Sequence, residues 1–181
     1  SLLSLQSQQL TDDNAIKAVK SSESRINAMA LIHRKLYTVD QNRTVDIKEY
    51  ITELIQYLVY SYGYHEKNFK LDLEIKEISI DVDKAIPLGL ILNELVLNAL
   101  KYAFPGRIGT IVVGLHATDG EHVLTVTDDG VGMDEPSVAP SGTGLGQRIV
   151  RALAGQIGGA FMIGPHENGS GTECSVRWSA Q

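Results

Sequence analysis

The sequence is poor in cysteine and has no long uninterrupted hydrophobic run. Its single cysteine, Cys174, excludes an internal disulfide and a cysteine-built metal site, and indicates a reducing compartment. No segment reaches the roughly 18 consecutive apolar residues of a membrane span, and no charged-then-apolar leader opens the chain. We therefore expect a cytoplasmic fragment without direct membrane contact. Because the chain starts at Ser1 and not at Met, we expect a longer parent, whose membrane anchor, if it has one, lies outside these residues.

Clustered basic residues are also missing. The 181 residues carry 16 Lys/Arg and 22 Asp/Glu, a formal net charge of −6, which is the opposite of a nucleic-acid footprint. Residues 1–42 hold five Lys/Arg and four Asp/Glu, so residues 43–181 hold the remaining eleven and eighteen. The acidity belongs to the larger part, and we expect no nucleic-acid partner.

The sequence does contain a clear change of pattern along its length. Residues 1–42 predict two helices joined by the polar turn TDDN, a hairpin whose small core favours a homodimer built as a four-helix bundle. In the larger part, residues 43–181, the pattern first predicts a helix capped by Asp46 and ending near Gly63, and then a two-stranded hairpin in 69–82. A helix capped by Asp83, with Pro87 in its first turn, and two strands joined by Asp119-Gly120 are predicted next. A glycine-rich loop in 130–146, a helix that follows it and two final strands complete the predicted order. The fold class predicted is α+β: a helical hairpin, then a two-layer α/β sandwich with helices on one face of a mixed, mainly antiparallel sheet.

A polar stripe interrupts the apolar helix predicted in 86–104. Glu94, Asn98 and Lys101 fall within about 60° on one helix face and about 10 Å along its axis. A carboxylate, an amide and an ammonium that are desolvated together cost several kcal/mol each unless something pairs with them. The stripe therefore requires partners, either other side chains or a ligand.

Three short motifs follow the stripe, and each alone is ambiguous. Asp128 with Gly130 and Gly132 suits a carboxylate that accepts from an exocyclic amine, but is equally typical of a hairpin turn. The GTGLG segment at 142–146 precedes a helix, where free N–H groups suit phosphate, yet it is neither a P-loop nor a GxGxxG match. Gly171-Thr172 is by itself a turn, and matters only if its hydroxyl joins the site of Asp128.

Taken in order, the stripe and the three motifs resemble the ATP-binding domain shared by sensor histidine kinases, gyrase-type topoisomerases, Hsp90 chaperones and mismatch-repair ATPases. SLLSLQ, RINAMALIHRKLY and VDIKEYITELI further resemble the histidine kinases with a variant, HWE-like dimerisation and phosphoacceptor domain. The resemblance covers essentially all 181 residues. It implies a Bergerat-type ATP-binding fold, the cofactors ATP and Mg²⁺, a response regulator receiver domain as partner, and transfer of the γ-phosphoryl group to a histidine.

The resemblance also implies roles for single residues. Asn98 would coordinate Mg²⁺, Glu94 would act on the attacking group or a metal-bound water, and Lys101 would lie against phosphate oxygens. Asp128 would accept from the adenine amine. The nucleotide-contacting positions implied in addition are Tyr102, Gly130, Gly132, Met133, Gly142, Thr143, Gly144, Leu145, Gly146 and Thr172.

Two departures from the family pattern affect these expectations. The loop from Met133 to Ser141 is short and lacks a phenylalanine-bearing segment, so we expect a less ordered lid. The phosphoacceptor histidine of the family would lie upstream of Ser1. His33 imitates that segment but is better explained as a helix residue packing locally. The alternatives are an ATPase module of the topoisomerase or chaperone type, a degenerate nucleotide-binding dimerisation module, and a serine-directed anti-sigma kinase.

Overall fold

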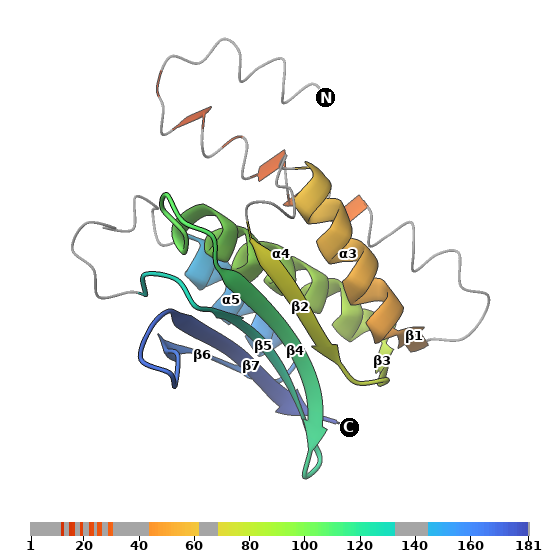
Figure 1. The fold of residues 1–181 in the computed structure, drawn as a ribbon. Coiled ribbons are helices and arrows are strands. Elements are labelled where there is room, and N and C mark those ends of the chain that lie inside the picture. The colour runs from red at the N-terminus through yellow and green to blue at the C-terminus, as the bar shows by residue number, and fades with distance from the viewer. Residues whose placement is uncertain are drawn as a thin grey trace.

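The centre of the fold is a mixed five-stranded sheet in the order β2-β4-β5-β7-β6 (Figure 1). The computed structural model describes residues 12, 15–16, 19, 22–23, 25–26, 29–30, 44–61, 69–132 and 145–180. The strands of the sheet are β2 (Lys70–Ile75), β4 (Thr110–Thr118), β5 (Glu121–Asp128), β6 (Ala160–Pro165) and β7 (Thr172–Ser179). Only β2 and β4 run parallel, and the other neighbours are antiparallel. The predicted mixed, mainly antiparallel sheet is confirmed.

The predicted hairpin between β4 and β5 closes at Asp119-Gly120. Both residues have positive φ, 50° and 82°, as a two-residue turn that matches strand twist requires. The register pairs Thr118 with Glu121 and continues to Ile111 with Asp128. The hairpin therefore delivers Asp128 to the far end of the sheet, beside the start of β7.

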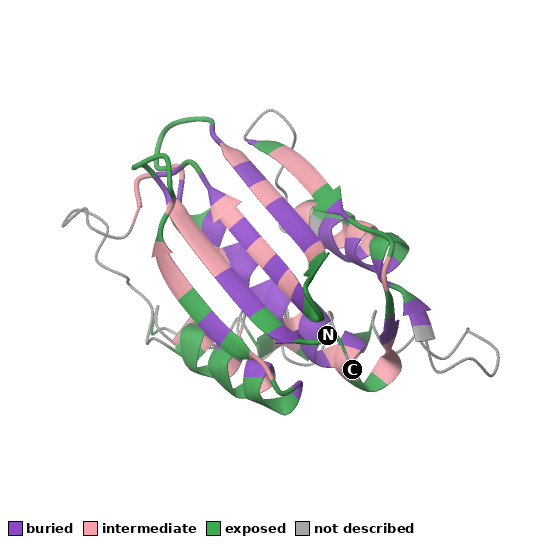
Figure 2. Cartoon of the chain, turned by 90° about the horizontal axis from the view of Figure 1, so that it is seen from below, coloured by how far each residue is buried: buried purple, intermediate pink, exposed green. Residues whose placement is uncertain are grey.

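Three helices cover one face of this sheet: α3 (Ile47–Ser61), α4 (Val82–Tyr102) and α5 (Leu145–Gln156). Seen from the opposite side, the sheet is a pleated surface of mixed burial with the helices behind it (Figure 2). Along β5, residues 122, 124, 126 and 128 are buried and alternate with partly exposed ones, as a half-covered sheet demands. The predicted two-layer sandwich is thus confirmed.

Helix α4 is the core of the domain. By length and composition it could cross a membrane, but 72% of its most apolar window is buried inside the fold, as in a core helix of a soluble domain. Helix α3 begins where predicted, since Asp46 Oδ1 accepts hydrogen bonds from the N–H groups of Lys48 and Glu49 at 3.0 and 3.3 Å. Burial of the Tyr50 ring on α3 raises the pKa of its hydroxyl, which donates to the Ala85 carbonyl at 3.2 Å.

The hairpin predicted within residues 69–82 is wrong. Strand β3 (Ser79–Asp81) leaves the main sheet and pairs antiparallel with β1 (Thr44–Asp46), while β2 pairs parallel with β4. Apolar alternation predicts that a segment is extended and half-buried, but it does not choose the neighbouring strand.

The predicted start of α4 is wrong by two residues. The cap is Asp81, whose Oδ1 accepts from the N–H of Asp83 at 2.9 Å, and the helix begins at Val82. Pro87 is consequently the sixth residue of the helix and lies beyond its first turn, where its missing N–H removes an intrahelical hydrogen bond. Pro87 is buried in the core, so packing there offsets that loss.

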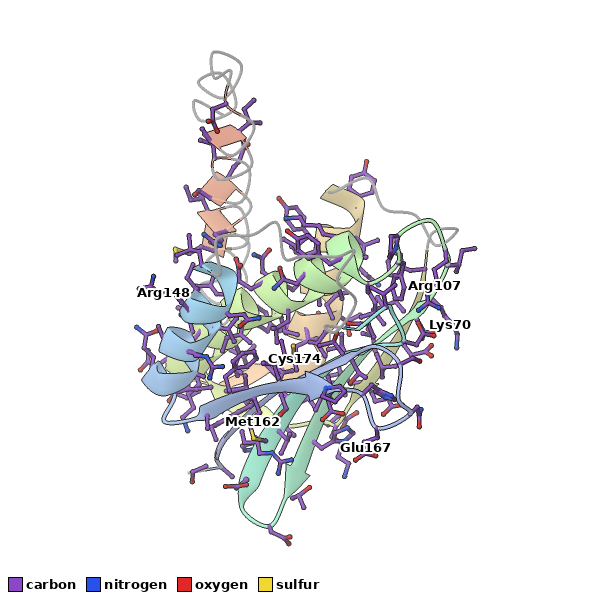
Figure 3. The ribbon with its side chains drawn as sticks, turned by 90° about the vertical axis from the view of Figure 1, so that its left-hand side faces the viewer. Lys70, Arg107, Arg148, Met162, Glu167 and Cys174 are labelled. Carbon is purple, nitrogen blue, oxygen red and sulfur yellow. The ribbon has the colours of Figure 1, made fainter. Side chains whose placement is uncertain are left out.

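The described residues between 15 and 30 are helical, and we call them the N-terminal helical segment. Asp12 caps this segment, because its Oδ1 accepts from the Ala15 N–H at 2.8 Å and its carbonyl accepts from the Ile16 N–H at 3.0 Å. The predicted cap in TDDN is confirmed there. The predicted first helix of the hairpin and His33 lie outside the described residues. Figure 3 shows the N-terminal helical segment rising from the α5 end of the helical layer.

Candidate functional site

The Asp128 carboxyl is held at the end of β5 by two backbone donors. Its Oδ1 accepts from the Gly130 N–H at 3.0 Å and from the Thr172 N–H at 3.2 Å, and the residue is only 8% exposed. Desolvation raises the pKa of this carboxyl, although both hydrogen bonds oppose that shift. A buried carboxyl with fixed orientation is suited to accepting a hydrogen bond from a ligand amine.

Glycines are required around Asp128 for steric reasons. A Cβ at Gly171, where φ is +94°, would lie 1.8 Å from the Asp128 carbonyl oxygen. Gly132, with φ of +76°, packs directly against the Gly171 backbone, and a Cβ at Gly130 would lie 2.5 Å from the Ala103 carbonyl oxygen. The three glycines bring the β5 end, the β7 start and the C-terminus of α4 into direct backbone contact.

A second group of residues supports the same corner. The Asp129 Oδ1 accepts from the Thr110 N–H at 2.7 Å, and the Asp129 carbonyl accepts from the Arg107 guanidinium. That guanidinium also lies 5.9 Å from the centre of the Phe104 ring. Gly109 has no room for a side chain between Phe104 and Asp129. The segment after α4 is thereby tied to the segment after β5.

The stripe on α4 faces the start of α5. Glu94 is buried at 6% exposure, Asn98 is partly buried and Lys101 is exposed. A Cβ at Gly146 would lie 3.1 Å from Glu94 Oε2 and 3.8 Å from Asn98 Nδ2. Gly146 therefore lies close against two polar groups of α4 at the first turn of α5, and a side chain there would crowd the Glu94 carboxylate.

The Glu94 carboxylate has a partner that the sequence did not reveal. Arg25 of the N-terminal helical segment binds both of its oxygens, with Nε to Oε1 at 2.5 Å and Nη2 to Oε2 at 3.0 Å. The Asn93 amide also donates to Oε1 at 3.5 Å. No local pattern marks Arg25, because the two charged residues are 69 positions apart and only the tertiary fold brings them together.

The ammonium of Lys101 belongs to the same electrostatic group. Desolvation lowers the pKa of Lys101, the Glu94 charge raises it, and the Arg25 charge lowers it further. The three charges therefore influence one another within one site.

The other predicted residues divide into two sets. Tyr102 and Leu145 are exposed, at 38% and 46%, on the C-terminal turn of α4 and the first turn of α5. Met133, Gly142, Thr143 and Gly144 lie outside the described residues. The structure therefore brings together the stripe and the start of α5 on one side, and Asp128, Gly130, Gly132 and Thr172 on the other.

The donor set fits a hard cation held mainly by a nucleotide. Among the described residues there is no cluster of three or more His, Cys, Asp or Glu that could hold a metal by itself. The partly buried Asn98 amide carries an oxygen of the hard type that suits Mg²⁺, an ion that takes one or two protein oxygens and keeps water and phosphate as its other ligands.

Comparison with known proteins agrees with this geometry. Residues 83–181 match the family described as histidine kinase-, DNA gyrase B- and HSP90-like ATPases, and residues 1–62 match a family described as histidine kinase. The chain belongs to the histidine kinase-, DNA gyrase B- and HSP90-like ATPase family. The predicted resemblance to an ATP-using histidine kinase core is confirmed by these two matches.

Individual relatives carry the same description. The chain is 31% identical over 109 residues to blue-light-activated histidine kinase 2 of Erythrobacter litoralis, covering 59% of this chain and 31% of that protein. It is 26% identical over 174 residues to the sensor histidine kinase PdtaS of Mycolicibacterium smegmatis, covering 94% of this chain and 34% of that protein. The chain thus spans about a third of the length of these relatives.

A solved structure shows the same fold over nearly the whole chain. It is the histidine kinase domain from the Erythrobacter litoralis EL346 blue-light activated histidine kinase, with a TM-score of 0.73 at 22% identity. The match covers 97% of this chain and 92% of that one. The predicted fold class is confirmed.

Proposed function

We propose that this chain is the catalytic core of a two-component sensor histidine kinase. It binds ATP with Mg²⁺ and transfers the γ-phosphoryl group to a histidine. The phosphoryl group is then transferred from that histidine to an aspartate of a response regulator. The observation that carries the proposal is the Asp128 carboxyl, buried and oriented by the Gly130 and Thr172 N–H groups in a glycine-lined corner. Such a carboxylate can accept a hydrogen bond from the exocyclic amine of adenine.

The residues of the site then divide the work of phosphoryl transfer. Asn98 holds Mg²⁺, which neutralises charge on the phosphates when it is bound. Lys101 lies toward the phosphate oxygens, and the glycines of 142–146 with Leu145 and Thr143 wrap the phosphates as the loop closes. Tyr102, beside Lys101, and Met133 also contact the nucleotide.

The transfer itself needs little covalent chemistry from the protein. An imidazole nitrogen of the acceptor forms a bond to the γ-phosphorus, the bond from that phosphorus to the β–γ bridging oxygen breaks, and ADP leaves with the electron pair. The imidazole proton passes to Glu94 or to solvent. Catalysis is mainly positioning and charge stabilisation, so the placement of Glu94 beside Asn98 matters more than its basicity.

The assembly and setting follow from the same proposal. The N-terminal part, residues 1–42, dimerises with a second copy, and the ATP-binding part is residues 43–181. The chain works in the cytoplasm and contacts neither nucleic acid nor the membrane directly. The net charge of −6 agrees with this, since nucleic-acid binding generally relies on an excess of Lys and Arg.

The decisive experiment is calorimetric titration of the chain with Mg·ATP. Wild type is expected to bind. Asp128→Asn is expected to lose roughly tenfold or more in affinity, because the amide can turn its own N–H₂ donor toward the adenine amine, which is also a donor. Asp72→Asn is the matched control, since Asp72 is a carboxylate of β2 that pairs with Lys70 at the surface. Asn98→Ala is expected to remove the Mg²⁺ dependence of binding. Equal affinities for wild type and Asp128→Asn would contradict the proposed site.

A further inference from the structure

The bidentate contact between Arg25 and Glu94 lies in the middle of the proposed catalytic site. The guanidinium presents Nε and Nη2 to the two carboxylate oxygens, at 2.5 and 3.0 Å. The side chains are 21% and 8% exposed, so the pair is largely withdrawn from water. Fork-like pairs of this kind are the strong and geometrically specific ones.

In this arrangement the Glu94 carboxylate is directed at Arg25. Both of its oxygens are engaged by Arg25, and Oε1 accepts a further hydrogen bond from Asn93. A carboxylate that must orient or accept from an attacking group needs at least one oxygen directed at that group. The N-terminal helical segment, through Arg25, thus binds the carboxylate that the proposed reaction uses.

Apolar side chains surround the ion pair on the same side. Ile26 and Met29 of the N-terminal helical segment, together with Arg25, line a cavity of about 150 Å³ against α4 and α5. Leu90, Glu94, Ile149 and Leu153 form its other wall. Ile26 and Met29 remain 53% and 50% exposed, so the segment rests on the helices without a closely packed interface. This loose apolar packing contributes little binding energy, so the docking depends mainly on the ion pair between Arg25 and Glu94.

We propose that Arg25 is an autoinhibitory latch: it docks the N-terminal helical segment onto α4 and α5 and withholds Glu94 from catalysis until the segment moves away. This inference rests on the proposed kinase function of the site. It goes beyond that function because it assigns regulation to a residue outside the ATP-binding part. A signal that shifts the N-terminal helical segment would then release Glu94 without altering the nucleotide pocket at Asp128.

The test compares the whole chain with Arg25→Ala, using slow ATP hydrolysis as the readout of Glu94. Release of the latch is expected to raise the rate of ADP formation by roughly 5- to 150-fold, the usual range of a coupling between two states. The affinity for Mg·ATP should change by less than about twofold, because Asp128 is untouched. Arg177→Ala is the matched control, since Arg177 is an exposed arginine of β7.

Two further variants separate the latch from a general loss of structure. Arg25→Lys keeps the charge but cannot form the fork, so its rate is expected between wild type and Arg25→Ala. Met29→Asp keeps Arg25 but places a second carboxylate in the cavity that Glu94 lines, so charge repulsion should weaken the docking and raise the rate as well. In all releasing variants, backbone amides of α4 and α5 that face the cavity should exchange hydrogen faster in the absence of nucleotide.

The outcomes distinguish the two proposals. If wild type binds Mg·ATP but Arg25→Ala leaves both turnover and hydrogen exchange unchanged, the latch is overturned and the proposed function stands. A lower turnover in Arg25→Ala also overturns it, because Arg25 would then assist the reaction. If no variant binds Mg·ATP, the proposed function and the latch both fall.

Discussion

Gly171→Ala should damage the fold and the nucleotide site together. Gly171 has φ of +94°, and a Cβ there would lie 1.8 Å from the Asp128 carbonyl oxygen and 2.9 Å from the Asp129 Cα. Backbone atoms cannot rotate away as a side chain does, so β7 must shift from the end of β5. The shift breaks the hydrogen bond from the Thr172 N–H to Asp128, which is 3.2 Å long in the native fold.

The magnitude can be separated into two parts. A non-glycine residue at positive φ costs about 1–2 kcal/mol. Loss of a hydrogen bond to a charged group costs a further ~1.5–3 kcal/mol. We therefore expect Gly171→Ala to lower the free energy of unfolding by about 2.5–5 kcal/mol in total, which is a large part of a typical domain stability.

Gly169→Ala supplies the matched control. Gly169 has φ of +82°, but a Cβ there meets nothing within 4 Å, so only the conformational cost applies. Urea unfolding of both variants isolates the steric part, and Mg·ATP titration of the folded fractions should show weaker binding only for Gly171→Ala. If the two variants differ by less than ~0.5 kcal/mol, the argument from the Asp128 backbone contact is refuted.

Two further predictions concern titratable groups. Desolvation raises the pKa of Asp128 above its ordinary 3.8, so the folded state binds this proton more tightly than the unfolded state, and the free energy of unfolding falls as pH rises from 3.8 through the raised pKa. Asp128→Asn should flatten this pH dependence in urea unfolding curves measured from neutral pH toward 3.8, and an unchanged dependence would contradict the prediction. Burial and the charges of Asp128 and Glu173 raise the pKa of Cys174 to about 12, so its thiol should resist iodoacetamide in the native protein and react once the chain is unfolded in urea. Mass spectrometry measures this alkylation, and rapid alkylation of the native chain would contradict the prediction.

Local patterns predicted those elements whose stabilising contacts are close in sequence. Asp46 capped α3 as expected, and Asp119-Gly120 closed the β4–β5 turn, because a cap and a two-residue turn are completed within a few residues. The polar stripe was predicted for the same reason, since helical periodicity alone aligns Glu94, Asn98 and Lys101.

The failures all involve a choice among distant partners. Strand β3 pairs with β1, 35 residues earlier, and β2 pairs with β4, although apolar alternation favoured a local hairpin. The α4 cap moved from Asp83 to Asp81 because β3 ends at Asp81, so the strand pairing fixed the helix start. An apolar pattern identifies a segment as a strand, but the partner strand is decided by competition among strands that are distant in the sequence.

By itself the sequence determined the class of fold, the order of its motifs and the requirement that the α4 stripe find partners, because periodicity and glycine placement act locally. Only the tertiary structure decided which partners those are. It set Gly146 beside Glu94 and Asn98, and it brought Arg25 across 69 residues to bind the Glu94 carboxylate. An ion pair between two segments depends on how helices dock, and docking follows from the packing of the whole core.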